Sequence, residues 1–214
     1  MPLVSLAGVA LGLMMQLDTA RLCVTEGTIG KVGSRLSVNA SKMRAVALVA
    51  TAHAVEIRFT YRGRTRQVSR LGSGRIRQQL GLKLRAADGC NVVYAMWRIA
   101  PESELVVSVK HNPTMHQSSE CGNRGYQNIK AQHAEAAPRL SPGESHVMRA
   151  EMRGQQLTVF IDRRKYWVGS LGPEALSFDG PIGLRSDNVR IDFELFSGAP
   201  EPGDKTAVPA CADS

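Results

Sequence analysis

The sequence predicts an all-β protein built as an antiparallel β-sandwich. The strongest observation lies in residues 143–196, where short segments of alternating apolar and polar residues are separated by turn residues such as glycine, proline and aspartate. This alternation marks strands with one buried face, and turns about every 8–12 residues are typical of sandwiches and barrels. The strands expected in this part are Val147–Met152, Leu157–Ile161, Tyr166–Val168, Gly183–Leu184 and Val189–Phe196.

Earlier in the chain the same pattern predicts further strands. Val55–Tyr61 is the clearest of them, because its odd-numbered residues are apolar or aromatic and its even-numbered residues are polar. Met43–Ala54 is rich in alanine and valine, and it fits a buried strand or a helix equally well. The other strands are expected within Leu22–Val38 and at Ile76–Arg85, Asn91–Ile99, Glu104–Lys110 and Tyr126–Ala131.

The order of motifs in residues 143–196 resembles the second half of concanavalin A-like (laminin-G-like) jelly rolls. That family includes secreted sugar-binding modules and glycan-active enzymes, so the resemblance implies a jelly-roll fold and contact with carbohydrate without deciding between binding and catalysis. A looser likeness extends over residues 80–130. The residues that carry the resemblance are Gly143, His146, Arg149, Ala150, Glu151, Leu157, Val159, Asp162, Trp167, Gly169, Phe178, Gly180, Pro181, Gly183, Arg185, Ser186, Asp187, Asn188, Asp192, Phe193 and Leu195.

One position departs from the family pattern. After the strand that ends near Ile161, the family usually has an Asp-Gly turn, whereas this chain has Asp162-Arg163. A type I′ turn needs positive φ at both central residues, which glycine adopts easily and arginine does not. The sequence therefore argues against a type I′ turn at this point.

Positive charge is concentrated in one segment. The chain has 214 residues and a formal net charge of +8 at pH 7, and its length suits one domain with short tails. Residues 57–87 contain nine basic residues and no acidic one. Such a run attracts polyanions, and it also fits a solvated surface whose arginines pair with acids elsewhere. No nucleic-acid-binding motif accompanies it, so nucleic acid is not an expected partner.

The two ends of the chain differ in composition from the middle. Residues 1–20 contain the apolar run Leu3–Met15, which fits a secretory signal peptide or an N-terminal strand or helix of the domain. Residues 197–214 are rich in glycine, proline and alanine and are expected to form a flexible tail. We therefore expect a β-sandwich domain over residues 21–196, a secreted or periplasmic location, and no membrane span, because no other apolar run reaches the required length.

The cysteines favour an oxidising compartment. None of the four stands in a Cys-x-x-Cys pair, so a structural zinc site is not expected. Cys90 and Cys121 both lie in predicted loops, and a disulfide between them would close a loop of about 32 residues and contribute ~3–4 kcal/mol. Cys23 and Cys211 flank the domain and form a second possible pair. Four reduced thiols in a cytosolic protein are the alternative.

A candidate binding face follows from the strand alternation. In strands 81–85, 92–99, 105–112 and 126–130, the apolar residues point to the core and the remainder point outward. Arginine and lysine bind carboxylate or sulfate groups, and tyrosine stacks on sugar rings. This face therefore predicts binding of an anionic glycan, although a solvated sheet surface would have a similar composition. The outward residues are Lys83, Arg85, Tyr94, Arg98, Lys110, Asn112, Tyr126, Asn128 and Lys130.

Catalysis is the main alternative to simple binding. Glycoside hydrolysis usually needs two carboxylates, and the predicted face has none in its strands. A polysaccharide lyase instead needs a base, for which Tyr126, His111 or His116 would serve, and cations or amides that neutralise a uronate. A structural envelope module without ligand is the third possibility. We expect no catalytic residue to be identifiable, no cofactor and no metal.

The sequence Arg185-Ser186-Asp187-Asn188 is the last feature of note. Asp187 and Asn188 would suit a calcium site at a loop rim, but two ligands are too few for calcium. The favoured interpretation is structural, with Asp187 and Asn188 hydrogen-bonded to the turn before the last strand and Arg185 paired locally.

Overall fold

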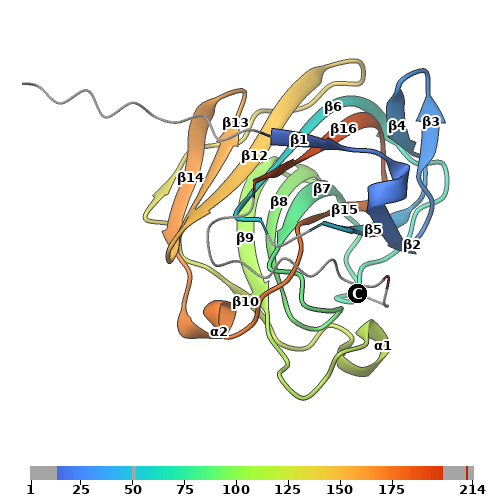
Figure 1. Ribbon diagram of the computed structural model, residues 1–214. Helices are drawn as coiled ribbons and strands as arrows, with labels where there is room; N and C mark the ends of the chain where they lie inside the picture. Colours follow the sequence, from blue (N-terminus) through green and yellow to red (C-terminus); the bar gives the residue numbers. More distant parts are fainter. Residues whose placement is uncertain (1–13, 50–51, 200–210, 212–214) are drawn as a thin grey trace, which may run out of the picture.

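The computed structural model describes residues 14–49, 52–199 and 211, and within them the chain forms two antiparallel sheets packed face to face (Figure 1). This confirms the predicted all-β antiparallel sandwich. Sheet 1 has the order β11 (His133–Ala134), β14 (Arg164–Ser170), β13 (Gln156–Ile161), β12 (Ser145–Arg153), β6 (Ala54–Arg64), β16 (Val189–Gly198), β4 (Arg35–Val38) and β3 (Gly30–Val32), with β1 (Met14–Leu17) paired to β16. Sheet 2 has the order β10 (Tyr126–Asn128), β9 (Glu104–Lys110), β8 (Val92–Ala100), β7 (Gln78–Leu84), β15 (Gly183–Asp187), β5 (Lys42–Ala47) and β2 (Leu22–Glu26).

Helices are short and lie in the connections. They are a 3-10 turn at Thr19–Arg21, α1 at Ser118–Cys121 and α2 at Pro173–Leu176. In the described ranges, none of them has the length and apolar character needed to cross a bilayer.

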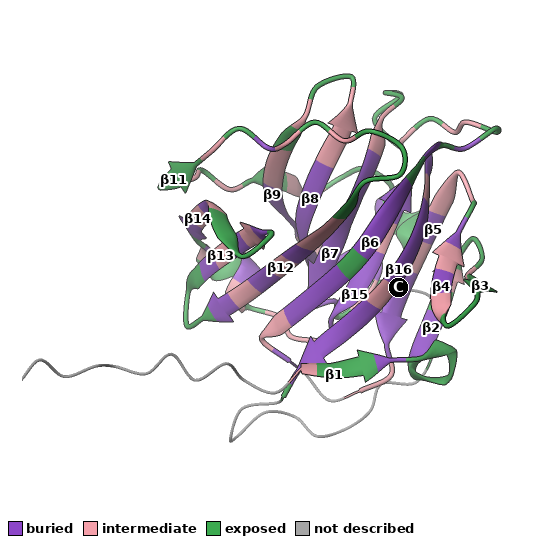
Figure 2. Cartoon of the chain, turned by 90° about the horizontal axis from the view of Figure 1, so that it is seen from above, coloured by how far each residue is buried: buried purple, intermediate pink, exposed green. Residues whose placement is uncertain are grey.

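The core lies between the inner faces of the two sheets. Val55, Ile57 and Phe59 of β6 are at most 1% exposed, and they face apolar side chains that alternate along β7 and β8. Phe59 meets Trp97 edge to face, with ring centroids 5.9 Å apart. Figure 2 shows this burial along β6 and β16, whereas β3 and β11 at the edges are exposed. Burial of one face explains why the period-two pattern identified these strands.

The ambiguous segment Met43–Ala54 begins as a strand. β5 pairs with β2 on one side and with β15 on the other, and Met43, Ala45 and Ala47 are fully buried. A strand between two neighbours satisfies its backbone hydrogen bonds within the sheet, so helix formation offers no advantage. The region Leu22–Val38, expected to hold one short strand, forms β2, β3 and β4.

The folded strands extend beyond the expected domain limits of residues 21 and 196. β1 lies inside the expected signal segment, and Leu17 is 1% exposed against the core. β16 continues to Gly198, which pairs with Met14. Removal of residues 1–20 would therefore delete a strand from sheet 1. Residues 1–13, 200–210 and 212–214 lie outside the described residues, so cleavage and a flexible tail stay predictions.

The turn after β13 differs from the sequence-based expectation. Asp162 and Arg163 have φ values of 51° and 69°, which is the left-handed geometry that a type I′ turn requires. The Asp162 side chain accepts hydrogen bonds from the backbone N–H of Val147 and contacts His146 Nδ1 at 2.7 Å. These contacts offset the strain of a non-glycine residue in this region, so the expectation of another turn type was wrong.

Candidate functional site

The outer face of sheet 2 holds a cavity of about 460 Å³. Its walls include Arg44 of β5, Arg185 of β15, Tyr94 of β8, Lys110 of β9 and Tyr126 of β10. In β5, β8, β9 and β15, apolar residues next to these positions belong to the core, so strand alternation directs the polar side chains away from it. The five residues come from five strands, and β-pairing brings them together.

Two loops cover part of this face. Gly72, in the connection between β6 and β7, and Asn123, just after α1, both line the cavity. A Cβ on Gly72 would lie 3.3 Å from the Asn123 Cβ, so the two loops touch. In agreement with a covered face, Lys83 is 2% exposed and Tyr94 is 5% exposed although both point away from the main core. The predicted binding face is therefore partly covered by two loops.

A buried carboxylate next to the cavity organises two arginines of its lining. Asp187 is fully buried, and its Oδ1 accepts a hydrogen bond from Arg44 Nη2 at 2.6 Å. Its Oδ2 accepts from Arg185 Nε at 3.0 Å and from Gln79 Nε2 at 2.7 Å. Burial alone would raise the pKa of Asp187, but the two arginines and Gln79 outweigh it and lower that pKa below its ordinary value. Asp187 is therefore an anion that holds both guanidinium groups in place.

Arg185 has a hydrogen-bonding capacity that the protein does not use fully. Its Nη1 donates to the Tyr126 hydroxyl at 2.9 Å, and its guanidinium lies 5.0 Å from the centre of the Tyr94 ring. Within the described residues, Arg185 Nη2 has no hydrogen-bond partner. By contrast, Arg44 donates to Asp187 and to the backbone carbonyls of Met43 and Ser186. Arg185 is the arginine that remains able to bind a ligand anion.

The two tyrosines form the aromatic part of the cavity. The rings of Tyr94 and Tyr126 are stacked with centroids 6.0 Å apart, and Lys110 Nζ lies 5.5 Å from the centre of the Tyr126 ring. Burial, and then the proximity of Tyr126, raise the pKa of Tyr94 above its ordinary value. The Tyr94 hydroxyl therefore stays protonated and can donate a hydrogen bond.

The pKa values of the two lysines of the site are lowered toward neutral pH. Burial, followed by repulsion from Arg44 and Arg185, lowers the pKa of Lys83 to about 7. Burial and Arg185 lower the pKa of Lys110 to about 8. The charge of the cavity therefore changes near neutral pH, and a bound anion would favour the protonated lysines.

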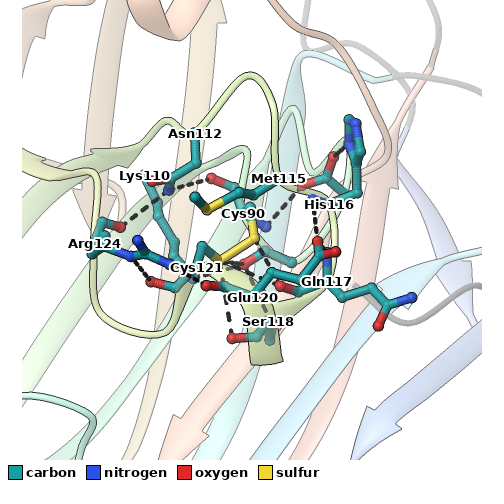
Figure 3. Close-up of a disulfide and its surroundings, with 12 residues drawn as sticks. Cys90, Lys110, Asn112, Met115, His116, Gln117, Ser118, Glu120, Cys121 and Arg124 are labelled. Carbon is teal, nitrogen blue, oxygen red and sulfur yellow. Dashed lines mark hydrogen bonds and ion pairs between the residues drawn. A yellow bond between two sulfur atoms is a disulfide. The ribbon is translucent and has the colours of Figure 1, made fainter.

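The disulfide Cys90–Cys121 fixes the loop that carries α1 beside Lys110 (Figure 3). Lys110 Nζ donates to the Gly89 carbonyl at 2.8 Å, and the Asn112 side chain donates to the carbonyls of Cys90 and Arg124. The position of Lys110 thus depends on the residues next to the disulfide. A second disulfide joins Cys23 and Cys211, so both cysteine pairs suggested by the sequence are bonded.

We expect the double variant Cys90→Ala/Cys121→Ala to lose about 3–4 kcal/mol of unfolding free energy, because the loop between the two residues is no longer closed in the unfolded chain. Urea unfolding of the variant and the wild type measures the difference. The variant Cys23→Ala/Cys211→Ala is the control for general loss of a disulfide. Equal unfolding midpoints for wild type and the first variant would contradict the expectation.

Four of the nine residues predicted for the binding face lie together: Lys83, Tyr94, Lys110 and Tyr126 form or underlie the cavity. Asn128 and Lys130 are exposed and lie outside its lining. Asn112 is engaged with backbone carbonyls, as described above. His111 and His116, considered as bases, also lie outside the lining; His111 stacks on Phe178 and His116 pairs with Asp88.

Two predicted arginines have other partners. Arg85 has φ 50°, which ends the alternation of β7, and its guanidinium donates to the carbonyls of Ala175 and Phe178 beside α2. Arg98 lies at the opposite end of sheet 2 and pairs with Glu104. A break in backbone geometry and a cross-strand ion pair thus remove both from the cavity.

The sequence reasoning missed Arg44, Arg185, Asp187 and Gln79. Arg44 lies in the segment that fitted a strand or a helix, so no face was assigned to it. Arg185 and Asp187 were interpreted as a local turn. Alternation from Leu184 would have placed both on the outer face, so that signal was present in the sequence. The turn interpretation holds for Asn188, which has φ 58° and bonds the loop before β7.

Comparison with known proteins gives fold similarity only. No protein-family model and no curated protein sequence matches the chain. Among solved structures, the carbohydrate-binding module CBM66 from Bacillus subtilis has a TM-score of 0.57 and 13% identity, covering 81% of this chain and 91% of that one. Domain 4 of the arabinanase AbnA from Geobacillus stearothermophilus, in complex with arabinotriose, has a TM-score of 0.46 and 13% identity over 85% and 84%. The chain therefore shares its β-sandwich fold with a carbohydrate-binding module.

Proposed function

We propose that this protein is an exported carbohydrate-binding module of the concanavalin A-like jelly-roll type that binds an anionic glycan in the cavity on sheet 2. The observation that carries the proposal is Arg185, whose Nη2 has no hydrogen-bond partner in the described part of the chain while its remaining contacts are fixed by Asp187 and Tyr126. A preoriented guanidinium in a partly covered cavity binds carboxylate or sulfate with directional, charge-assisted hydrogen bonds.

The remaining cavity residues suit a sugar. Tyr126 is partly exposed and offers a ring and a hydroxyl group, Tyr94 stacks on it, and Lys110 adds a positive charge beside the Tyr126 ring. A volume of about 460 Å³ lies within the range of small-molecule sites. The two disulfides fit export to an oxidising compartment.

The proposal is tested with immobilised neutral, uronate-containing and sulfated glycans at low and at physiological salt. We expect retention of the anionic glycans by the wild type and a loss of about ten- to a hundredfold in affinity for Lys110→Gln, because a charged hydrogen bond contributes about 1.5–3 kcal/mol. Lys130→Gln is the matched control, since Lys130 is exposed and lies outside the cavity lining. Equal affinities for both variants, or no retention of any glycan, would overturn the proposal.

A polysaccharide lyase is the second candidate, and the hydrogen bond between Arg185 Nη1 and the Tyr126 hydroxyl favours it. The Tyr126 hydroxyl would serve as the base, while the cations beside it would neutralise a uronate carboxylate. The same glycans, followed by ultraviolet absorbance of unsaturated uronate products, distinguish the two. Growth of that signal, lost in Tyr126→Phe, would establish lyase activity in place of simple binding.

A further inference from the structure

The connection between β6 and β7 carries arginines that the cavity does not use. Arg64, Arg66, Arg70 and Arg75 are exposed, and no described acidic residue forms an ion pair with any of them. Arg58, Arg62 and Arg85, which lie on either side of the connection, behave differently: they pair with Glu56, Asp192 and Asp179 respectively. The interpretation in which the arginines of the run pair with acids elsewhere therefore does not hold for its central part. We call residues 64–77 the arginine loop.

The arginine loop is held in a defined shape. Asn188 is fully buried, and its Nδ2 donates to the carbonyls of Ser69 and Arg77 at 2.9 and 2.8 Å. Its Oδ1 accepts from the Ser69 backbone N–H at 2.8 Å. At the tip, Leu71 and Arg75 share a backbone hydrogen bond. The arginines are thus presented from a fixed backbone, which reduces the entropy cost of binding.

The arginine loop is continuous with the cavity. Gly72 at its tip is part of the cavity wall and contacts Asn123 on the opposite loop. At its base, Arg77 leads into β7. Burial, together with the positive charges of Arg98, Arg75 and Arg185, lowers the pKa of Arg77 from its ordinary value. Basic residues therefore occur both in the cavity lining and in the exposed loop that borders it.

We infer that the arginine loop extends the cavity into a track for a linear polyanion, so that the ligand is an acidic polysaccharide with one unit in the cavity and the following charged units along the loop. This inference rests on the proposed function, because it assigns the cavity to the same ligand. A polysaccharide with a charge on each repeating unit matches several unpaired arginines better than a glycan with a single terminal acid would. Several such contacts together raise the affinity even when each one is weakly specific.

The test compares short and long anionic glycans with two charge-matched variants. Arg66→Gln/Arg70→Gln/Arg75→Gln removes three charges from the arginine loop. Arg139→Gln/Arg153→Gln/Lys165→Gln removes three exposed charges elsewhere. Affinities are measured for an anionic disaccharide and for the corresponding polysaccharide between low and physiological salt, with thermal melting of each variant as a check of folding.

We expect the loop variant to bind the polysaccharide at least tenfold more weakly and to reduce the slope of log affinity against log salt by up to about 3, as three fewer charge contacts release fewer counterions. Its affinity for the disaccharide and the behaviour of the control variant should equal the wild type. An unchanged polysaccharide affinity and slope in the loop variant would overturn the inference.

The same measurements separate this inference from the proposed function. If the disaccharide does not bind and Lys110→Gln leaves the affinity for glycans unchanged, the cavity proposal fails, even if the loop variant still binds the polysaccharide more weakly than the wild type. If wild type binds double-stranded DNA or phosphatidylglycerol vesicles more tightly than any polysaccharide, and the loop variant loses that binding, the loop serves another polyanion and the inference is overturned.

Discussion

Replacing Asp187 by asparagine should lower the free energy of unfolding by about 3–5 kcal/mol and abolish anion binding in the cavity. The loss of one partner of a buried ion pair leaves the other charge without compensation. Here two guanidinium groups lose their common carboxylate, and the asparagine amide N–H₂ would face the donors of Arg44, Arg185 or Gln79. Urea unfolding measures the stability, and retention on anionic glycans measures the site.

Glu104→Gln is the control for this variant. Glu104 also pairs with an arginine of sheet 2, but its side chain is 47% exposed, and a solvent-exposed pair contributes at most about 1 kcal/mol. If Asp187→Asn cost no more than Glu104→Gln, the role of Asp187 as the anchor of Arg44 and Arg185 would be refuted.

Replacing Lys83 by methionine should stabilise the protein, with the largest gain below about pH 7. Lys83 is 2% exposed, and no ion pair or hydrogen bond reaches its Nζ from the described residues. The pKa of its amine falls from 10.5 to about 7 on folding. Between these pH values the amine is therefore protonated in the unfolded chain and mostly neutral in the folded protein. The wild type therefore becomes more stable as pH rises from about 7 to 10.5, and the advantage of methionine decreases by a few kcal/mol over that range.

The check is urea unfolding of wild type and Lys83→Met at several pH values within the range in which the protein stays soluble. Lys130→Met is the control, because Lys130 is exposed and its replacement should give a small difference that does not vary with pH. A gain for Lys83→Met that is constant with pH would mean that the buried amine does not titrate in this interval. A loss at low pH would mean that the charged amine has a stabilising partner.

The strands were predictable because their signal is local. In β6, apolar and polar residues alternate, and the structure buries the apolar ones, such as Ile57 and Phe59, as expected. The segment of β5 lacked this signal. Its alanines and valine occur in succession, and only pairing with β2 and β15 makes it a strand. The Asp162-Arg163 turn was likewise set by side-chain contacts with the neighbouring strand β12 and not by residue preference.

The site was predictable only in part, for a related reason. Alternation correctly directed Lys83, Tyr94, Lys110 and Tyr126 to one face of sheet 2. It could not show that Arg44 lies beside Asp187, because these residues are 143 positions apart and meet only through the pairing of β5 with β15. It also placed Arg85 on that face, whereas a positive φ at the end of β7 turns the side chain toward α2.

The sequence by itself determined the fold class, the positions of most strands, the face to which most of the alternating strands direct their side chains, and the location of the basic segment. These properties depend on residues close together in the chain and on the alternation of apolar and polar residues along each strand. The tertiary structure alone decided the strand order, the grouping of Arg185, Asp187 and Arg44, and the contact of Gly72 with Asn123 that covers the outer face. These depend on pairing and loop packing between distant segments, whose energies arise only once the two sheets have assembled.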